Sequence, residues 1–236
     1  MPGMGSRGMI LKQVEMGPML NFVYLIGCEE TREAAVVDPA WDVPGILELA
    51  QQCDLKITRV LLTHGHPDHM NGLEALVKAT DAQVCLHTDE TGYLKEVAAY
   101  FGMSVDFLGR RSGNLRATTN GETIHLGKLP LQFLHTPGHT PGSQCFLVDG
   151  RLISGDTLFI GSCGRTDLPG SDPSQMYYSL TQRLGALPEE TILFPGHNYG
   201  GASSTIGDEK RSNPFMRFAA LGDFLRVMGG GRIVSP

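Results

Sequence analysis

One short stretch of the sequence, THGHPDHMNG, contains four side chains of the types that bind metal ions. His64 and His66 are two residues apart, so on an extended chain both imidazoles leave the same face. Asp68 and His69 follow across Pro67, which stiffens the loop. Imidazole nitrogens and carboxylate oxygens bind divalent cations, so this stretch predicts a metal site rather than a histidine-rich surface turn.

Further candidate ligands occur at three later places, each beside a strand-like run. His139 lies between two Pro-Gly turns, Asp156 follows RLISG, and His197 follows TILFPG. With the first stretch they make seven candidates, namely His64, His66, Asp68, His69, His139, Asp156 and His197. Three or four ligands fill one site, so seven predict two metal ions that share a ligand. A carboxylate bridges two cations well, which makes Asp156 the expected shared ligand.

Two metal ions about 3.5–4 Å apart lower the pKa of a shared water to about 7. No serine or cysteine nucleophile is then required, and we expect a metal-dependent hydrolase with Asp68 and Asp156 in catalytic as well as ligand roles. The expected cofactors are two divalent metal ions. Zinc is the first choice, and iron and manganese also suit these ligands. Cys163 is expected to be a packing residue, since no paired base lies near it in the sequence.

The remaining histidines are expected to have other roles. His87 and His125 lie in strand-like segments and are expected to be structural or exposed. His135 precedes His139 by four residues and is expected to support a metal ligand rather than to be one.

The elements that position these residues can be read from hydrophobic periodicity and from turn residues. Strands are predicted at 9–14, 20–27, 34–39, 57–66 (running into a polar loop), 83–87, 122–127, 131–139, 143–150, 151–156 and 191–197. Helices are predicted at 43–53, 71–80, 89–102, 174–187 and 213–229. Two strand-rich halves with helices between them predict two sheets packed face to face and covered by helices, an αββα layering.

Composition limits the class of protein. Of 236 residues, 41% are apolar and 19% are charged, which is typical of a folded globular chain. We expect a single domain that covers residues 1–236, in which residues 1–8 form a disordered leader. No apolar run approaches the roughly 20 residues of a membrane helix, and no signal core follows the first methionine. The net charge of −6, without a Lys/Arg cluster, argues against nucleic-acid binding. Five widely spaced cysteines without a CxxC pair predict reduced thiols and a cytoplasmic location. The sequence does not predict the oligomeric state.

The order of these motifs resembles that of the metallo-β-lactamase superfamily, over nearly the whole chain. The resemblance implies an α+β fold, the αββα sandwich with two mixed sheets flanked by helices. It also implies one ligand set for each metal, bridged by Asp156: His64, His66 and His139 for the first, and Asp68, His69 and His197 for the second.

Within this superfamily, GSCGRTDLPGSD, PGHNYG and STIGDEKRSNPF resemble the short bacterial glyoxalase II-like proteins. These are similar to hydroxyacylglutathione hydrolases, which cleave the thioester of S-lactoylglutathione, so a small thioester of the glutathione type is the expected substrate. The resemblance implies that Arg165 and Tyr199 help to hold glutathione. From the residues alone, a surface ion pair of Arg165 with Asp167 is a nearly equal alternative. Thr166 replaces the aromatic residue of longer members, and the chain after His197 is short, so a smaller or different thioester is also open.

A rival interpretation has the same fold and different chemistry. CGRTD also resembles the persulfide dioxygenases, which bind one iron through two histidines and an aspartate, here His64, His139 and Asp156. LPG after this motif, in place of an aromatic-containing stretch, favours the hydrolase. A third alternative is a metal-binding protein without turnover, which would need a metal site closed by its own side chains.

Overall fold

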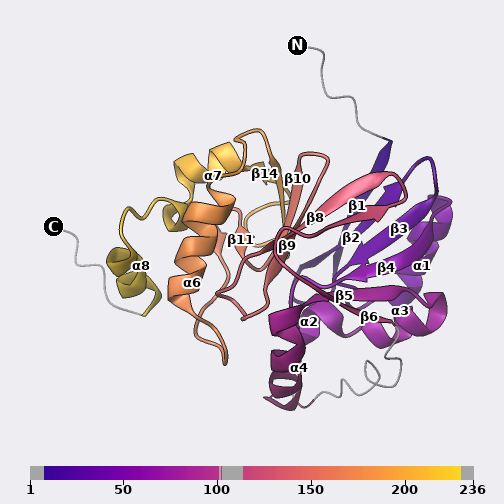
Figure 1. The fold of residues 1–236 in the computed structure, drawn as a ribbon, viewed down its shortest axis with the longest axis horizontal. Helices are drawn as coiled ribbons and strands as arrows, with labels where there is room; N and C mark the ends of the chain where they lie inside the picture. The colour runs from indigo at the N-terminus through magenta and orange to yellow at the C-terminus, as the bar shows by residue number, and fades with distance from the viewer. Residues whose placement is uncertain (1–7, 101, 103–113, 230–236) are drawn as a thin grey trace, which may run out of the picture.

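Two sheets lie face to face in the computed structural model, which describes residues 8–100, 102 and 114–229 (Figure 1). The first sheet has the order β1-β2-β3-β4-β5-β6 and the second the order β14-β13-β10-β9-β8-β7. The strands of the first are β1 (Met9–Met16), β2 (Asn21–Cys28), β3 (Glu33–Val37), β4 (Lys56–Leu61), β5 (Gln83–His87) and β6 (Leu115–Thr118). Those of the second are β7 (Thr123–Leu126), β8 (Leu129–His135), β9 (Gln144–Val148), β10 (Arg151–Gly155), β13 (Ile192–Pro195) and β14 (Ser204–Thr205). Each sheet contains parallel and antiparallel neighbours, so both are mixed, as predicted.

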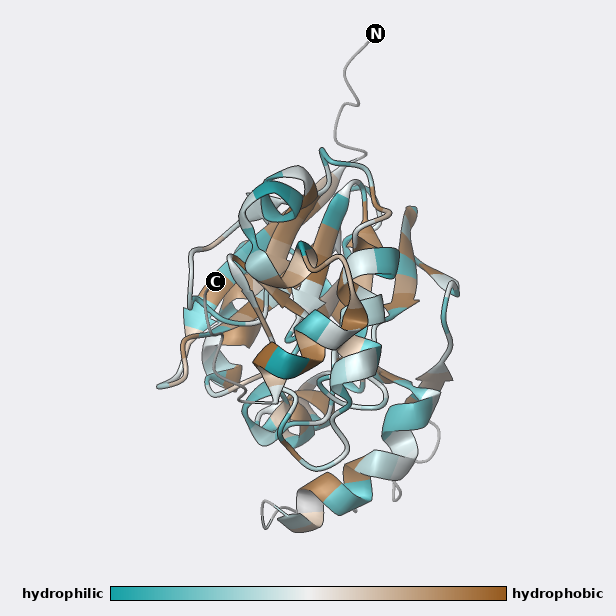
Figure 2. Cartoon of the chain, turned by 90° about the vertical axis from the view of Figure 1, so that its left-hand side faces the viewer, coloured by the Kyte–Doolittle hydropathy of each residue, from teal (hydrophilic) through white to brown (hydrophobic). Residues whose placement is uncertain are grey.

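Helices cover the outer face of each sheet, which completes the predicted αββα layering (Figure 1). The helices of the first half are α1 (Val43–Gln52), α2 (Pro67–Met70), α3 (Leu73–Thr80) and α4 (Thr88–Tyr100). Those of the second half are α6 (Pro173–Tyr178), its π-helical continuation η1 (Ser179–Leu184), α7 (Ile206–Ser212), the 3₁₀ turn η2 (Pro214–Met216) and α8 (Leu221–Met228). Hydrophilic and hydrophobic segments alternate along the helices of this half, as expected of helices with one buried side (Figure 2).

The alternation of side chains along β2 shows how one strand serves two interfaces. Val23 and Leu25 pack toward the helices, whereas Tyr24 and Ile26 pack between the sheets. All eight residues of β2 are buried, because a strand covered on both faces must be apolar on both.

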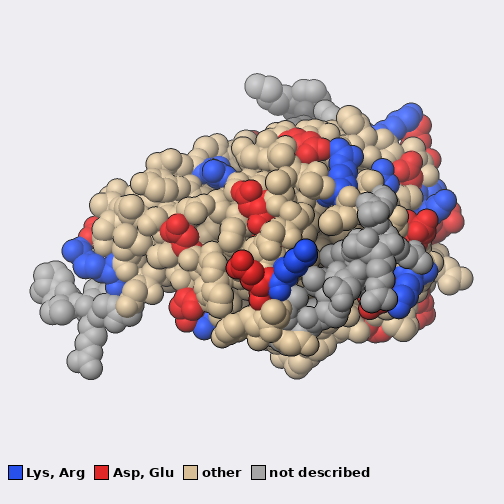
Figure 3. Space-filling model, turned by 60° about the horizontal axis from the view of Figure 1, so that its bottom comes forward, with Lys and Arg blue, Asp and Glu red and all other residues tan. Residues whose placement is uncertain are grey.

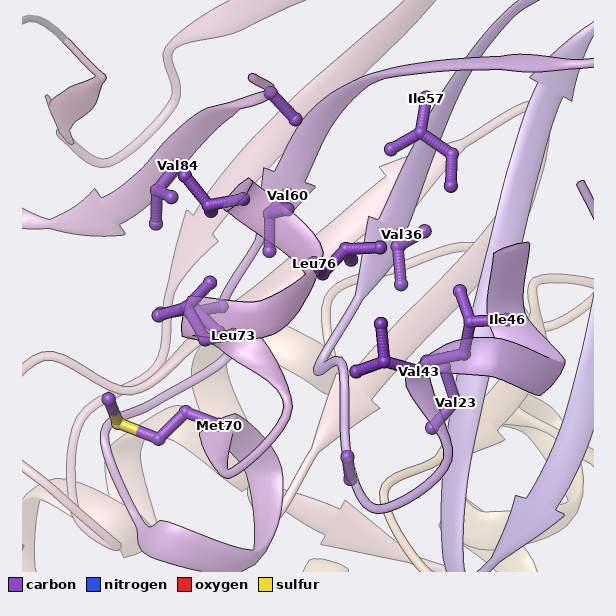
Figure 4. Packing of buried hydrophobic residues seen from close by; sticks show 14 of the residues in the cluster. Val23, Val36, Val43, Ile46, Ile57, Val60, Met70, Leu73, Leu76 and Val84 are labelled. Carbon is purple, nitrogen blue, oxygen red and sulfur yellow. The ribbon is translucent and has the colours of Figure 1, made fainter. Parts of the chain in front are cut away.

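Three apolar clusters fill the interfaces between the four layers. Leu76 of α3 belongs to the first, between helices and sheet (Figure 4). Phe133 and Phe146 lie between the two sheets with their rings 5.5 Å apart. Met176 and Phe224 belong to the third cluster, which joins the second sheet to its helices. The layers therefore form one continuous core around the strand ends that carry the metal-binding motifs.

The two sheets also meet directly at one point of their backbones. Asn21 at the start of β2 forms an isolated antiparallel bridge with His197, just after β13. On either side of it, the N–H of Phe22 donates to the oxygen of Gly196 and that of Asn198 to the oxygen of Leu20, at 2.8 and 2.9 Å. This junction places a predicted metal ligand against the opposite half of the chain.

The C-terminal prediction was wrong in part. A single helix at 213–229 is replaced by η2, a break at 217–220, and α8. Asn213 caps η2 by accepting from the N–H of Phe215, and its Nδ2 donates to the carbonyls of Phe159 and Ser162. These bonds anchor the start of the segment to a small sheet of β11 (Leu158–Phe159) and β12 (Ser162–Cys163).

The other differences between the predicted and the observed elements are smaller. α7 and the short strands β6, β11, β12 and β14 were not predicted. The helix predicted at 174–187 changes to π-type hydrogen bonding and ends at Leu184. The helix predicted at 89–102 begins at Thr88, and residue 101 lies outside the described residues. So does the predicted leader, apart from Gly8.

The surface agrees with the composition. Lysine and arginine are interspersed with aspartate and glutamate on the face shown in Figure 3. Within the described part of the chain, each helix is too short or too polar to cross a bilayer.

Candidate metal centre

The seven predicted ligands lie close together, and five of them line one pocket of about 580 Å³, namely His66, Asp68, His139, Asp156 and His197. They come from segments that follow four strands: the loop and α2 after β4, the β8–β9 loop, and the ends of β10 and β13. The five histidines are almost completely buried, while Asp68 and Asp156 are slightly more accessible. Residues spread over some 130 positions thus form a single polar cluster at one edge of the sandwich.

The first ligand set consists of His64, His66 and His139. His66 Nδ1 lies 3.0 Å from His64 Nε2 and 2.9 Å from His139 Nε2. Burial lowers the pKa of all three rings, which are therefore neutral and can each offer a lone pair. Nitrogens bound tetrahedrally to one zinc lie roughly 3.3 Å apart, so these distances fit a common metal ion.

The second set consists of Asp68, His69 and His197. The Nε2 atoms of the two histidines are 3.1 Å apart, and Asp68 Oδ2 lies 3.4 Å from the first and 3.5 Å from the second. Asn21 donates from Nδ2 to the same oxygen at 2.9 Å. Burial opposes ionisation of Asp68, but His69 and Asn21 bring its pKa below the usual value, so the carboxylate is ionised. The carboxylates of Asp156 and Asp68 in turn raise the pKa of His69 against its burial.

Asp156 lies between the two sets and turns one oxygen to each. Oδ1 is 3.3 Å from His69 Nε2 and 3.5 Å from His197 Nε2, and Oδ2 is 3.6 Å from His139 Nε2. Burial disfavours the carboxylate, but the neighbouring His69 and His197 hold the pKa of Asp156 well below its usual range. Oδ1 is buried and accepts no hydrogen bond from the described residues. A buried anionic oxygen without a donor fits a cation, and its position fits a bridge between two.

Carbonyl oxygens behind the rings fix the tautomers of two ligands. His139 Nδ1 lies 2.8 Å from the oxygen of Arg165, and His197 Nδ1 lies 2.8 Å from the oxygen of Met19. Since a carbonyl only accepts, Nδ1 carries the proton and Nε2 is left with its lone pair toward the site.

Asp38 is a functional residue that the sequence prediction missed. Its Oδ2 lies 2.9 Å from His69 Nδ1 and accepts from Thr63 Oγ1 at 2.6 Å, while Oδ1 accepts from the Thr63 N–H at 2.8 Å. Thr63 Oγ1 is in turn 3.0 Å from His64 Nδ1. One carboxylate therefore orients a ligand of each set. The available signal was an aspartate directly after the buried strand AAVV.

Glu90 is a second missed residue, and it joins two ligand loops. It is completely buried in α4 and accepts from the N–H of Gly65 at 2.7 Å, from the N–H of Gly142 at 2.8 Å and from Thr140 Oγ1 at 2.8 Å. Burial raises the pKa of Glu90 to about 7, although these hydrogen bonds lower it by favouring the ionised form. Gly65 separates His64 from His66, so Glu90 sets the distance of these ligands from the loop of His139.

The other histidines lie outside the ligand sets. His87 and His135 stack with ring centres 3.8 Å apart, and His135 Nε2 donates to the oxygen of Pro141 in the His139 loop. His125 is exposed on β7. Cys163 lines the pocket but is largely buried, and burial raises the pKa of its thiol to about 12.

The two predicted substrate-binding residues lie at the pocket mouth. Arg165 forms two contacts with Asp167, from Nε at 2.6 Å and from the second terminal nitrogen at 2.8 Å, with both side chains exposed. The structure therefore contains the ion pair weighed above as an alternative, beside the pocket. Tyr199 stacks on His197 with ring centres 4.6 Å apart, and it is 56% exposed.

The sandwich fold and the paired ligand sets define a class of metal-binding proteins, and comparison with known proteins agrees. Residues 16–197 match the model of the metallo-beta-lactamase superfamily, and the chain belongs to this family.

Individual relatives have different activities. Hydroxyacylglutathione hydrolase GloC of Haemophilus influenzae is 33% identical over 196 residues, which are 80% of this chain and 89% of that protein. The human mitochondrial persulfide dioxygenase ETHE1 is 27% identical over 231 residues, 96% of this chain and 83% of that protein. The crystal structure of ETHE1 from Myxococcus xanthus superposes with a TM-score of 0.80 at 34% identity, covering 97% of this chain and 92% of that one.

We expect Asp156→Ala to lose metal from both sites, because it removes the oxygen that faces each set. Metal per chain, measured by mass spectrometry after purification in zinc, should fall well below that of the unchanged protein. Asp167→Ala, which removes a carboxylate nearby that contacts neither set, is the matched control and should keep its metal. Full occupancy in Asp156→Ala would rule out the bridge.

We expect Glu90→Gln to weaken metal binding by roughly 10- to 100-fold, the usual effect of losing a group that orients ligands. The amide nitrogen would face N–H donors and push the two ligand loops apart. Competition with a chelator measures the affinity. Glu96→Gln, an exposed change on the same helix, should leave it unaltered. Equal affinities in the two variants would show that Glu90 does not position the loops.

Proposed function

We propose that this protein is a hydrolase with two divalent metal ions that cleaves S-acylglutathione or a related thioester. The observation that carries the proposal is the position of Asp156, with one oxygen toward each ligand set. Zinc is the first choice of metal, with iron and manganese as alternatives that suit the same donors.

Two bound ions would polarise the thioester carbonyl and lower the pKa of a water to about 7. The side chains around them have complementary tasks. Asp68 is ionised, faces the pocket, and can accept a proton from the attacking water. The water oxygen adds to the carbonyl carbon and the C–S bond then breaks. The leaving sulfur takes up the proton that Asp68 accepted, so the products are a carboxylic acid and a thiol. The protonated, largely buried thiol of Cys163 is a poor nucleophile, which favours attack by water.

Substrate-binding roles for Arg165 and Tyr199 extend this proposal. Both side chains line the same pocket as the ligands. A guanidinium can bind a carboxylate, and an exposed aromatic ring can cover an apolar part of a substrate. The similarity to GloC supports a glutathione-type thiol.

A persulfide dioxygenase is the second candidate, favoured by the similarity to the human and Myxococcus ETHE1 proteins. It would need one iron, held by His64, His139 and Asp156. The LPG stretch after GRTD, in place of an aromatic-containing stretch, favours the hydrolase.

A paired assay separates the two candidates. The protein is purified without added metal, its metal content is measured, and portions are loaded with zinc or with iron. We expect two metals per chain and hydrolysis of S-lactoylglutathione without oxygen uptake. One iron per chain and oxygen consumption with glutathione persulfide would establish the dioxygenase instead.

Arg165→Ala should raise KM by roughly three- to tenfold and change kcat by less than about twofold, because an exposed cation that anchors substrate contributes little to the reacting bonds. Steady-state kinetics with S-lactoylglutathione measure both constants. Arg151→Ala, which breaks a comparable ion pair with Asp149 on β10, should leave both constants unchanged. An unchanged KM in Arg165→Ala would leave its ion pair with Asp167 as its only role.

A further inference from the structure

Trp41, the single tryptophan of the chain, lines the metal pocket with its side chain partly exposed. Its φ of 61° is one that bulky residues rarely adopt, and the N–H of Asp42 donates to the oxygen of Ala40 at 2.8 Å. These features define a γ-turn centred on Trp41, in the form that is rare and strained. Such strain persists only where surrounding contacts hold it, and it concentrates at functional sites.

Several contacts fix the ring of Trp41 relative to the second ligand set. Its backbone N–H donates to Asn71 Oδ1 at 2.7 Å, and its indole Nε1 donates to Asn21 Oδ1 at 2.9 Å. The buried Asn21 also donates to Asp68. Gly17 lies against the ring so closely that a Cβ there would be 2.4 Å from it. These contacts fix the position of the indole ring, although metal binding does not require an aromatic ring there.

Other apolar side chains line the same pocket as Trp41. Met19 and Tyr199 line the same pocket and are 45% and 56% exposed, and Phe159 packs against Tyr199. Among the described residues that line the pocket, Arg165 is the one lysine or arginine, and Asp167 already pairs with it. Grouped, exposed apolar side chains at a pocket mouth are typical of a binding site.

The pocket therefore has two chemically different ends. Arg165 adjoins the first ligand set, because its carbonyl oxygen holds His139. Trp41 adjoins the second set through Asn21 and Asp68. A thioester whose carbonyl lies between the metals would direct its anionic thiol part to one end and its acyl part to the other.

We propose that Trp41, with Met19 and Tyr199, binds the acyl chain of the substrate, so that the preferred thioesters carry an aliphatic or aromatic acyl group of several carbons rather than a short hydroxyacyl group. This places Tyr199, which the family resemblance assigns to glutathione, at the acyl end, because its ring stacks on His197 of the second set. This inference rests on the proposed thioesterase function and narrows it. Each methylene moved from water into such surroundings tightens binding by about three- to fourfold. A hydroxyl on the acyl group would give up hydrogen bonds to water for an apolar wall, which disfavours it.

Binding can be tested apart from turnover, because the single tryptophan reports on its own site. Zinc-loaded protein is titrated with S-methyl-, S-butyl- and S-octylglutathione, thioethers that have no carbonyl to hydrolyse, and tryptophan fluorescence is followed. We expect Kd to fall at least tenfold from methyl to octyl, with a change in emission. Equal Kd values within twofold would overturn the inference, whether or not thioesters are cleaved.

Turnover gives the second measurement. The ratio of kcat/KM for S-hexanoylglutathione to that for S-lactoylglutathione should exceed ten in the unchanged protein. It should approach one in Trp41→Ala, mainly through KM, and stay high in Trp41→Phe, which keeps a ring. Tyr178→Ala, a change at a similarly exposed aromatic residue outside the pocket lining, should leave the ratio unchanged. Hydrolysis with no preference for the longer chain would leave the thioesterase in place and reject the role of Trp41.

If Trp41→Ala does not fold or bind zinc, the inference is tested by the thioether titration of the unchanged protein and by the kcat/KM ratio of Trp41→Phe. Chain-length-dependent thioether binding without any thioester cleavage would keep the apolar site and reject the proposed reaction.

Discussion

Nitrogen lone pairs and two carboxylates converge at one edge of the sandwich, and the rest of the structure is organised to hold them close together. Imidazole nitrogens of neighbouring ligands lie about 3 Å apart, beside the carboxylates of Asp68 and Asp156. The lone pairs of the neutral His64, His66 and His139 repel where they point at one another, and so do the two carboxylates, whereas His69 attracts both carboxylates. The fold must therefore hold the side chains against this repulsion, and divalent ions stabilise the result.

Support for the ligands comes from residues that never face the metals. Asp38 follows β3 and reaches a ligand of each set, directly or through Thr63. Glu90 lies in α4 and holds two ligand loops at a fixed separation. Both supports sit on or next to regular elements, which have well-defined positions. The loops can consequently be short and rich in glycine without loss of geometry.

How far the sequence predicts this arrangement depends on the range of each interaction. The ligand candidates and many strands follow from local patterns, since HGHPDH and the apolar run LNFVYLIG are each visible within ten residues. Glu90 was missed because its role depends on glycines 25 and 52 positions away. The anchoring role of Asn213 was missed for a similar reason, because it bonds to carbonyls on β11 and β12, about 50 positions earlier. Trp41 gave no signal at all, because a positive φ at a tryptophan cannot be inferred from residue type.

The backbone bridge between Asn21 and His197 has a consequence for how the active protein is made. It joins residues 176 positions apart, and contacts between residues so far apart in the sequence form slowly. His197 and the start of β2 reach their final positions only after the two halves of the chain have packed together. On a ribosome, the nascent chain would hold the ligands up to Asp156 while the last histidine was still unsynthesised. Complete metal loading would then mark the end of maturation rather than start it, and a truncated chain would be left with its second cation incompletely bound.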